Sequence, residues 1–214
     1  MTTTAALRRI DGATSQRVFD TLLRTLAEPG RILRFGDEVL DMPAVALGPL
    51  ALADVDVTVA VLGKDADLAG DLFRATGARI VAACDADLVI ADPALLGRPV
   101  VGADLDGLSI GSPLAPEDAC RLFVAVDAIH GIDAADAGSD AGTCVRLSGP
   151  GIAGHRCIGI DGLAVDVLAR LGRASGTFPT GIDTWLVAPD GAVVGLPRST
   201  TVELDTTTET DQEA

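Results

Sequence analysis

The sequence predicts an α/β protein, in which strands alternate with helices and helices cover the sheet. Short, continuously apolar runs such as Val57–Leu62 and Arg79–Ala83 are typical of strands that are buried on both faces. Helical patterns separate several of these runs, and this alternation indicates an α/β architecture. The chain has 214 residues and is 48% hydrophobic, which is enough for one domain with a sizeable core. Aromatic residues make up only 3%, so we expect an aliphatic core.

The first predicted helix, Thr14–Ala27, has a clear helical pattern. Thr14 or Ser15 is expected to cap its start, and Pro29-Gly30 to end it. The simplest interpretation is a helix that covers the sheet, and the alternative is a helix that faces a partner protein. Its apolar residues form one face, which consists of Val18, Phe19, Leu22, Leu23 and Leu26. Further helices are predicted at Ala44–Leu52, Asp67–Thr76 and Gly162–Leu171.

Strands are predicted at the remaining apolar runs. The turn Pro189-Asp190-Gly191 lies between two of them and predicts a β-hairpin. From Glu203 the apolar pattern stops, so we expect one domain over residues 1–203 and a disordered acidic tail over residues 204–214. The other predicted strands are Ala78–Ala83, Asp87–Ala91, Leu122–Val126, Cys144–Leu147, Arg156–Ile160, Ile182–Ala188 and Ala192–Leu196.

Composition excludes several classes of function. The formal net charge is −15, which argues against a surface for nucleic acid or anionic membrane but leaves room for a local arginine-lined pocket. No uninterrupted apolar run approaches membrane-spanning length, and the first residues do not resemble a signal peptide, so we expect a cytoplasmic protein. The aspartates of the loop Gly131–Gly142 lack the spacing of an EF-hand. We therefore expect a solvated loop there and no bound metal.

The spacing of the cysteines and histidines likewise argues against a metal site. The cysteines are widely separated and are expected to be reduced, buried thiols. The two histidines lack the close spacing of a local zinc pair. His155 could act as a general base, although an exposed loop histidine is the simpler interpretation. These residues are Cys84, Cys120, Cys144, Cys157, His130 and His155.

The turn Ser148-Gly149-Pro150-Gly151 is the first candidate site. It follows an apolar run, and glycine on both sides of proline predicts a tight turn with open backbone on each side. Ser148 and the turn amides could hold an anion or contact a partner. We expect at least one of Gly149 and Gly151 to have a positive φ.

Asp183 and Arg198 are the second candidate site. Asp183 is expected to hydrogen-bond the turn that begins at Phe178-Pro179. Arg198 has two interpretations, a salt bridge to Asp183 or a bidentate contact to a phosphate-like group, and the salt bridge is the simpler. Thr200 belongs to the same stretch.

Neither Lys64 nor Ser148 lies in a motif that would make it catalytic. The only Gly-Lys pair, Gly63-Lys64, is followed by aspartate and does not form a phosphate-binding P-loop. Ser148 is preceded by Arg146-Leu147 and does not form the Gly-x-Ser-x-Gly elbow of serine hydrolases, and no Gly-x-Gly-x-x-Gly dinucleotide motif follows the first predicted strands. The residues alone therefore indicate no catalytic constellation, and the catalytic residues stay unknown.

Four stretches resemble the PhnH family, a subunit of the bacterial carbon–phosphorus lyase system, which degrades phosphonates. Their order and spacing cover roughly residues 14–203. Ser199 departs from the Leu-Pro-Arg-Thr-Thr that the family often shows. The four stretches, referred to below as the signature stretches, are Phe19–Gly30, Leu147–Ile152, Phe178–Asp183 and Leu196–Thr201.

The resemblance implies a single-domain α/β/α sandwich with a mixed sheet, distantly like the large domain of pyridoxal-phosphate-dependent transferases. It implies PhnG-, PhnI- and PhnJ-like partner subunits, and a homodimer when the chain is isolated. The system transfers an alkylphosphonate to ribose C1 of ATP with release of adenine, and later steps cleave the carbon–phosphorus bond. This subunit is not known to hold the catalytic residues, so none is carried over, and no cofactor is expected.

Two other classes of function are alternatives. A pyridoxal-phosphate enzyme needs a Schiff-base lysine, and the only lysine is Lys64, in the charged turn Gly63-Lys64-Asp65, where we expect it to be exposed. A stand-alone anion- or sugar-phosphate-binding protein would use the turn from Ser148 to Gly151. Co-purification with the lyase subunits would discriminate between these readings.

Overall fold

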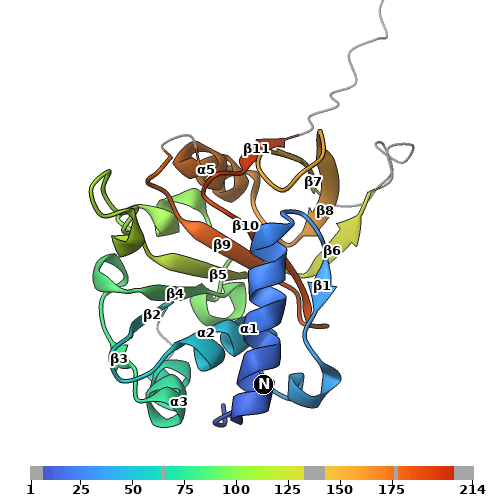
Figure 1. Ribbon diagram of the computed structural model, residues 1–214. Coiled ribbons are helices and arrows are strands. Elements are labelled where there is room, and N and C mark those ends of the chain that lie inside the picture. The colour runs from blue at the N-terminus through green and yellow to red at the C-terminus, as the bar shows by residue number, and fades with distance from the viewer. Residues whose placement is uncertain (1–6, 64–65, 133–142, 176–177, 205–214) are drawn as a thin grey trace, which may run out of the picture.

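The main sheet has seven strands within residues 7–63, 66–132, 143–175 and 178–204, which the computed structural model describes (Figure 1). They are β1 (Leu33–Arg34), β2 (Thr58–Leu62), β3 (Arg79–Ile80), β4 (Leu88–Ala91), β5 (Arg121–Ala125), β9 (Asp183–Val187) and β10 (Ala192–Leu196). Their order is β1-β10-β9-β5-β4-β2-β3. The strands from β9 to β3 run parallel, whereas β10 is antiparallel to both neighbours. The α/β class and the mixed sheet are confirmed.

A second, antiparallel sheet of four strands lies over one face of the main sheet. Its order is β11 (Thr201–Leu204), β7 (Thr143–Ser148), β8 (Arg156–Asp161) and β6 (Ala128–Gly131). Helix α5 (Val165–Ser175) packs against β11 and the 3₁₀ turn Gly102–Leu105. Side chains from both sheets and from α5, such as Leu122, Ile158 and Leu168, share one core. This outer layer is therefore a sheet with a helix, not the layer of helices alone that a simple α/β/α sandwich implies.

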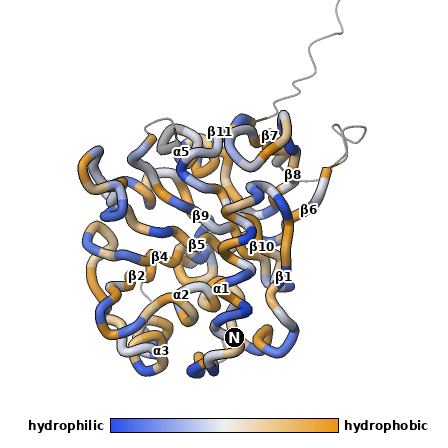
Figure 2. Tube along the Cα trace, viewed as in Figure 1, coloured by the Kyte–Doolittle hydropathy of each residue, from blue (hydrophilic) through white to orange (hydrophobic). Residues whose placement is uncertain are grey.

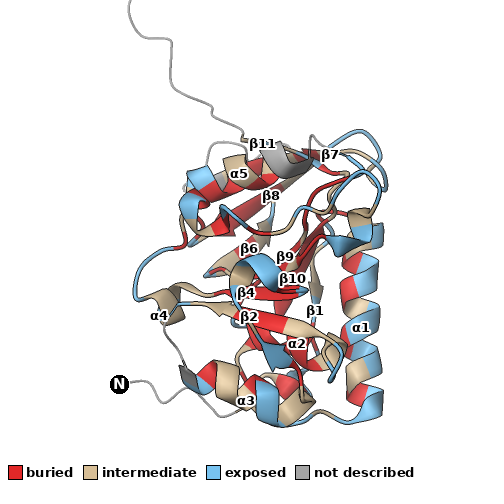
Figure 3. Cartoon of the chain, turned by 90° about the vertical axis from the view of Figure 1, so that its left-hand side faces the viewer, coloured by how far each residue is buried: buried red, intermediate tan, exposed pale blue. Residues whose placement is uncertain are grey.

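Three helices cover the opposite face of the main sheet, namely α1 (Gly12–Ala27), α2 (Leu47–Leu52) and α3 (Ala66–Thr76). Figure 3 shows the main sheet between these helices and the layer of α5, and Figure 2 shows hydrophobic residues along its central strands. The rings of Phe123 and Trp185 stack beneath α1 and α2, with centroids 4.8 Å apart. The Trp185 indole N–H donates to the Leu22 carbonyl and the Thr25 hydroxyl, both at 3.2 Å. Apart from this pair and Phe35, the buried core is aliphatic, as expected.

Helix α1 differs from its prediction in two respects. Its N-cap is Asp11, whose carboxylate accepts a hydrogen bond from the Thr14 amide at 2.7 Å, so the predicted cap at Thr14 or Ser15 is wrong. Val18 and Leu22 are buried as predicted, but Phe19 and Leu23 are 45% and 52% exposed. The apolar stripe of α1 is thus wider than the side that the sheet covers.

The other elements mostly follow their predictions. The β9–β10 hairpin is confirmed, and α5 begins at Val165, later than expected. The strand predicted at Ala78–Ala83 is limited to Arg79–Ile80, and α4 (Pro93–Leu96) lies where neither a helix nor a strand was predicted. Strand β11 continues to Leu204, so the tail cannot begin at residue 204. The rest of the predicted tail and most of the acidic loop, residues 133–142, lie outside the described residues.

Within the described part of the chain, no helix combines the length and hydropathy needed to cross a membrane.

Candidate functional site

The turn Ser148-Gly149-Pro150-Gly151 packs against the chain itself. Gly149 and Gly151 both have positive φ, 129° and 84°, which confirms the prediction. A Cβ atom on Gly149 would lie 2.9 Å from the Ser199 carbonyl oxygen, and one on Gly151 would lie 2.5 Å from the Ala27 carbonyl oxygen. The backbone room beside the two glycines is therefore filled by the end of α1 and by the segment after β10, rather than open to an anion.

Arg156 joins the same turn region to the end of α1. Its NH1 donates to the Pro29 carbonyl at 2.7 Å. A Cβ atom on Gly30 would lie 2.7 Å from Leu147 Cδ1 and 3.0 Å from Arg156 Cδ, so the two segments are in close contact. The sequence analysis missed Arg156 as a site residue, because an arginine at a strand end gives no sign of its distant partner.

Asp183 and Arg198 form the salt bridge that was the simpler prediction. Arg198 NH2 lies 2.9 Å from Asp183 Oδ2, and the Arg198 backbone amide donates to Oδ1 at 2.9 Å. Arg198 NH1 donates to the Pro116 carbonyl at 2.6 Å. The two side chains are only 15% and 21% exposed. Because the guanidinium is occupied by groups of its own chain, the alternative of a phosphate contact gains no support.

Thr200 lies beneath the turn and is completely buried. Its hydroxyl has no hydrogen-bond partner among the described residues, and the same holds for Thr184. The Thr200 Cα would be 3.5 Å from a Cβ atom on Gly149. A contact from Thr200 to an anion or a partner would require this packing to open. Ser148 is half-buried and stands opposite Thr201 in the β7–β11 ladder.

The other reactive side chains are scattered. His155 is exposed, as its simpler interpretation expects, and His130 Nε2 lies 2.6 Å from Asp161 Oδ2 on the second sheet. Cys120 is buried, and burial raises the pKa of its thiol to about 12, whereas Cys84 is exposed, so the expectation of buried thiols is wrong for Cys84. Among the described residues, no group of three or more histidine, cysteine or acidic side chains is placed to hold a metal ion.

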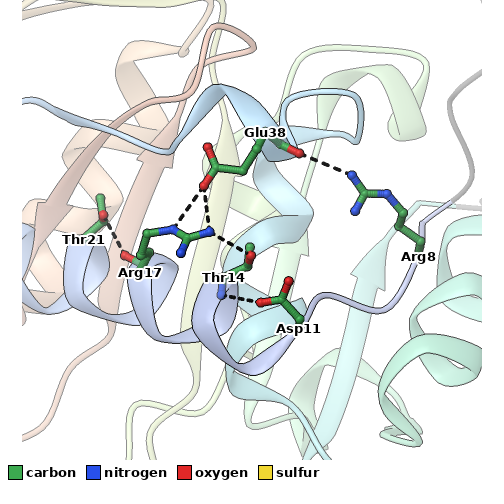
Figure 4. A network of polar contacts seen from close by, with 6 residues as sticks. All are labelled: Arg8, Asp11, Thr14, Arg17, Thr21 and Glu38. Carbon is green, nitrogen blue, oxygen red and sulfur yellow. Dashed lines mark hydrogen bonds and ion pairs between the residues drawn. The ribbon is translucent and has the colours of Figure 1, made fainter.

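A groove of about 360 Å³ lies between α1 and the segment around β1. Three arginines line it, Arg17, Arg24 and Arg34, together with two acids, Asp20 and Glu38. Arg17 is paired with Glu38 at 2.9 Å, as Figure 4 shows, and Arg34 is paired with Asp190 at 2.7 Å. Arg24 has no side-chain partner within the described chain, so its guanidinium is the one most available to an anion.

A second pocket, of about 450 Å³, lies where β4, β5 and β9 end. Ligands of open α/β sheets bind at the carboxyl ends of parallel strands, which makes this a natural place for a small molecule. Its walls are mainly apolar, and its charged residues are Asp92 and Asp127. Two carboxylates without a lysine or arginine make the pocket unsuited to a phosphate or phosphonate group.

These features can be compared with known proteins. The chain matches the family described as bacterial phosphonate metabolism protein (PhnH) over residues 11–203. The chain belongs to the PhnH family. The match includes all four signature stretches, whose residues pack against one another around the end of α1, the turn after β7 and the segment after β10. No curated protein matches the chain. Its family membership makes the chain a phosphonate metabolism protein.

Proposed function

We propose that this PhnH-family chain is a non-catalytic subunit of the carbon–phosphorus lyase core complex. That system transfers an alkylphosphonate to ribose C1 of ATP and releases adenine. The observation that carries the proposal is that the signature residues contact other parts of their own chain. Arg198 is occupied by Asp183 and the Pro116 carbonyl, and the two glycines of the turn abut Ala27 and Ser199. These residues stabilise the fold and are not presented to a reacting group.

On this proposal the chain works in the cytoplasm beside PhnG-, PhnI- and PhnJ-like subunits, and it forms a homodimer when isolated. It needs no cofactor of its own. One domain extends over residues 1–203, and an acidic tail follows β11. The family membership supports the pathway.

The test is co-purification. The chain, expressed with affinity-tagged PhnI-like, PhnG-like and PhnJ-like subunits from the same bacterium, should elute with them in a fixed ratio. The chain alone should show no turnover of ATP with methylphosphonate. Turnover by the isolated chain, or its absence from the purified assembly, would contradict the proposal.

Anion binding by the isolated chain is the second candidate, and the groove that contains Arg24 favours it. Calorimetric titration with methylphosphonate and with inorganic phosphate tests it, using Arg24→Ala as the variant and the exposed Arg31→Ala as the control. Stoichiometric binding that Arg24→Ala abolishes would support this candidate. A pyridoxal-phosphate enzyme would need a specific imine at Lys64, which lies outside the described residues. We expect pyridoxal phosphate to bind there no better than to any surface amine.

A further inference from the structure

The loop of residues 109–119 presents an exposed leucine at the amino-terminal edge of the main sheet. Leu114 is 97% exposed and lies at the tip of this loop. Figure 1 shows the segment as the yellow-green loop that stands out beside the starts of β5 and β9. A single exposed apolar side chain is common on protein surfaces, so the significance of Leu114 depends on its neighbours.

The loop is braced by its own hydrogen bonds. Ser112 and Ala115 bond each other's backbone in both directions, at 3.1 and 3.2 Å, which closes the turn that carries Leu114. Below this turn, the Cys120 amide donates to the Ser109 carbonyl at 2.9 Å, and the Ser109 hydroxyl donates to the Asp118 carbonyl at 2.8 Å. Leu114 is therefore held on a defined turn, so that little conformational entropy would be lost on binding.

A second loop, which begins at Phe178, lies against the first. Phe178 is 69% exposed. The Gly181 amide donates to the Ile110 carbonyl at 2.9 Å, which joins the two loops directly. Arg198 NH1 donates to the Pro116 carbonyl at 2.6 Å and lies 3.5 Å from the Pro179 carbonyl oxygen, so one guanidinium holds both loops. Ile110, on the first loop where it meets the second, is 36% exposed.

We propose that Ile110, Leu114 and Phe178 form a docking surface for a different protein, and this inference rests on the proposed function as a complex subunit. It gives the Asp183–Arg198 pair a role, which is to position the two loops that carry the apolar side chains. Arg198 is thus a positioning residue and does not itself face the partner. Interfaces of this kind depend on a few apolar anchors surrounded by a polar rim.

Charge decides which kind of protein fits. Glu117 and Asp118 are exposed on the same loop as Leu114. A second copy of the chain docked at this surface would bring the same two acids against this rim. Like charges across an interface are repulsive, whereas a basic rim would be attracted. The partner that fits is therefore a protein with an apolar hollow bordered by lysine or arginine.

The test measures binding to the assembly of PhnG-, PhnI- and PhnJ-like subunits prepared without this chain. Leu114→Ser and Phe178→Ser should each raise the Kd about tenfold or more, as truncation of an interface anchor does. Because both side chains are exposed, the melting temperature of the isolated variants should stay close to that of the wild type. The matched control is Phe73→Ser, which removes an aromatic ring that is 56% exposed on α3.

The rim is tested separately with the double variant Glu117→Lys, Asp118→Lys. It should slow association and flatten the dependence of the association rate on salt, because the attraction between rims is lost. An unchanged association rate and salt dependence would contradict the charged rim.

The outcomes separate this inference from the proposed function. If the wild-type chain fails to bind the assembly, the proposed function itself is wrong. If the wild type binds and Leu114→Ser and Phe178→Ser bind equally well, the docking surface is wrong and the subunit role stands. An equal loss in Phe73→Ser would place the interface elsewhere. If Leu114→Ser and Phe178→Ser abolish self-association and leave partner binding intact, the surface binds a second copy of the chain, and the proposal of a different protein is wrong.

Discussion

Arg198 and Asp183 are joined through both the backbone and the side chain of the arginine. The backbone amide and Nε of Arg198 reach Asp183 Oδ1 at 2.9 and 3.3 Å, and NH2 reaches Oδ2 at 2.9 Å. With NH1 on the Pro116 carbonyl, one side chain connects the segment after β10, the start of β9 and the loop before β5. Since the pair is mostly shielded from water, removal of one partner should cost more stability than it does at a surface ion pair.

The variant Arg198→Ala should lower the free energy of unfolding by about 2 kcal/mol, because it leaves the Asp183 carboxylate and the Pro116 carbonyl without their donor. Arg198→Lys should recover only part of this loss, since an ammonium group cannot replace the two-pronged guanidinium. Urea unfolding measures both. The control is Arg31→Ala, which breaks the half-exposed Arg31–Glu28 pair and should cost less than about 0.5 kcal/mol. Equal losses at residues 198 and 31 would contradict the stabilising role of Arg198.

Gly149→Ala and Gly151→Ala should both destabilise the chain. Each puts an L-residue at positive φ, which costs about 1 kcal/mol, and each adds a Cβ atom that collides with backbone. The control is Gly154→Ala in the loop that follows, where φ is also positive but nothing lies within 4 Å of the added Cβ. It should show the conformational cost alone, so thermal melting should rank Gly154→Ala above the other two in stability.

The growth of cells that carry the same variants tests whether the turn has a role besides stabilising the fold. Phosphonate-dependent growth of cells that carry Gly149→Ala or Gly151→Ala should follow their stability, because the added Cβ atoms meet the protein's own backbone. Growth loss in a variant that remains stably folded would show that the turn also contacts a partner or a phosphate group.

Local patterns explain why much of this fold could be predicted. The parallel core strands are continuously apolar, and the turn at Pro189-Asp190-Gly191 fixes the β9–β10 hairpin through local geometry. The missed strands β6 and β11 are short and depend on pairing with β8 and β7, which are distant in sequence. Such pairing leaves no periodic signal in a four-residue segment.

Prediction of the candidate site was limited for the same reason. The stretches that contain Gly149 and Arg198 could be singled out from sequence. The Asp183–Arg198 salt bridge and the positive φ in the turn at Gly149 were confirmed. The neighbours that fill the space beside the glycines, Ala27 and Ser199, come from other parts of the chain. Only the packing shows that the open backbone beside the two glycines is covered, and only the packing reveals the exposed Leu114.

Thr200→Val should leave stability unchanged or raise it by about 1 kcal/mol, because it replaces a buried hydroxyl that lacks a partner among the described residues with a methyl group of similar size. The matched control is Thr25→Val. Thr25 is equally buried, but its hydroxyl donates to the Leu22 carbonyl at 2.7 Å and accepts from Trp185 Nε1 at 3.2 Å. That variant should lose about 1–2 kcal/mol. Chemical denaturation of both compares them, and a comparable loss in Thr200→Val would mean that its hydroxyl is hydrogen-bonded after all.

Cys120 should make the protein less stable in alkali. Burial raises the pKa of its thiol from 9.0 to about 12, so between these values the unfolded chain loses a proton that the folded chain keeps. The contribution of Cys120 is complete below pH 9 and is lost as the pH rises from about 9 toward 12, by at most about 1.4 kcal/mol per pH unit. The chain has no tyrosine and a single lysine, and its three other cysteines are present in both the wild type and Cys120→Ala, so the comparison of these two proteins isolates Cys120.

Urea unfolding at several values between pH 8 and pH 11 measures this dependence. The free energy of unfolding should fall more steeply with pH in the wild type than in Cys120→Ala, which has no thiol to ionise at this position. The slopes are compared, because the smaller alanine side chain lowers stability at every pH through the cavity that it leaves. In the folded wild type, a thiol reagent at pH 8 should modify the exposed Cys84 and leave Cys120 unmodified, since the thiolate is the reacting form. Parallel pH profiles for the two proteins, or rapid modification of Cys120 in the folded state, would show that the thiol ionises normally and that its burial does not govern the alkaline stability.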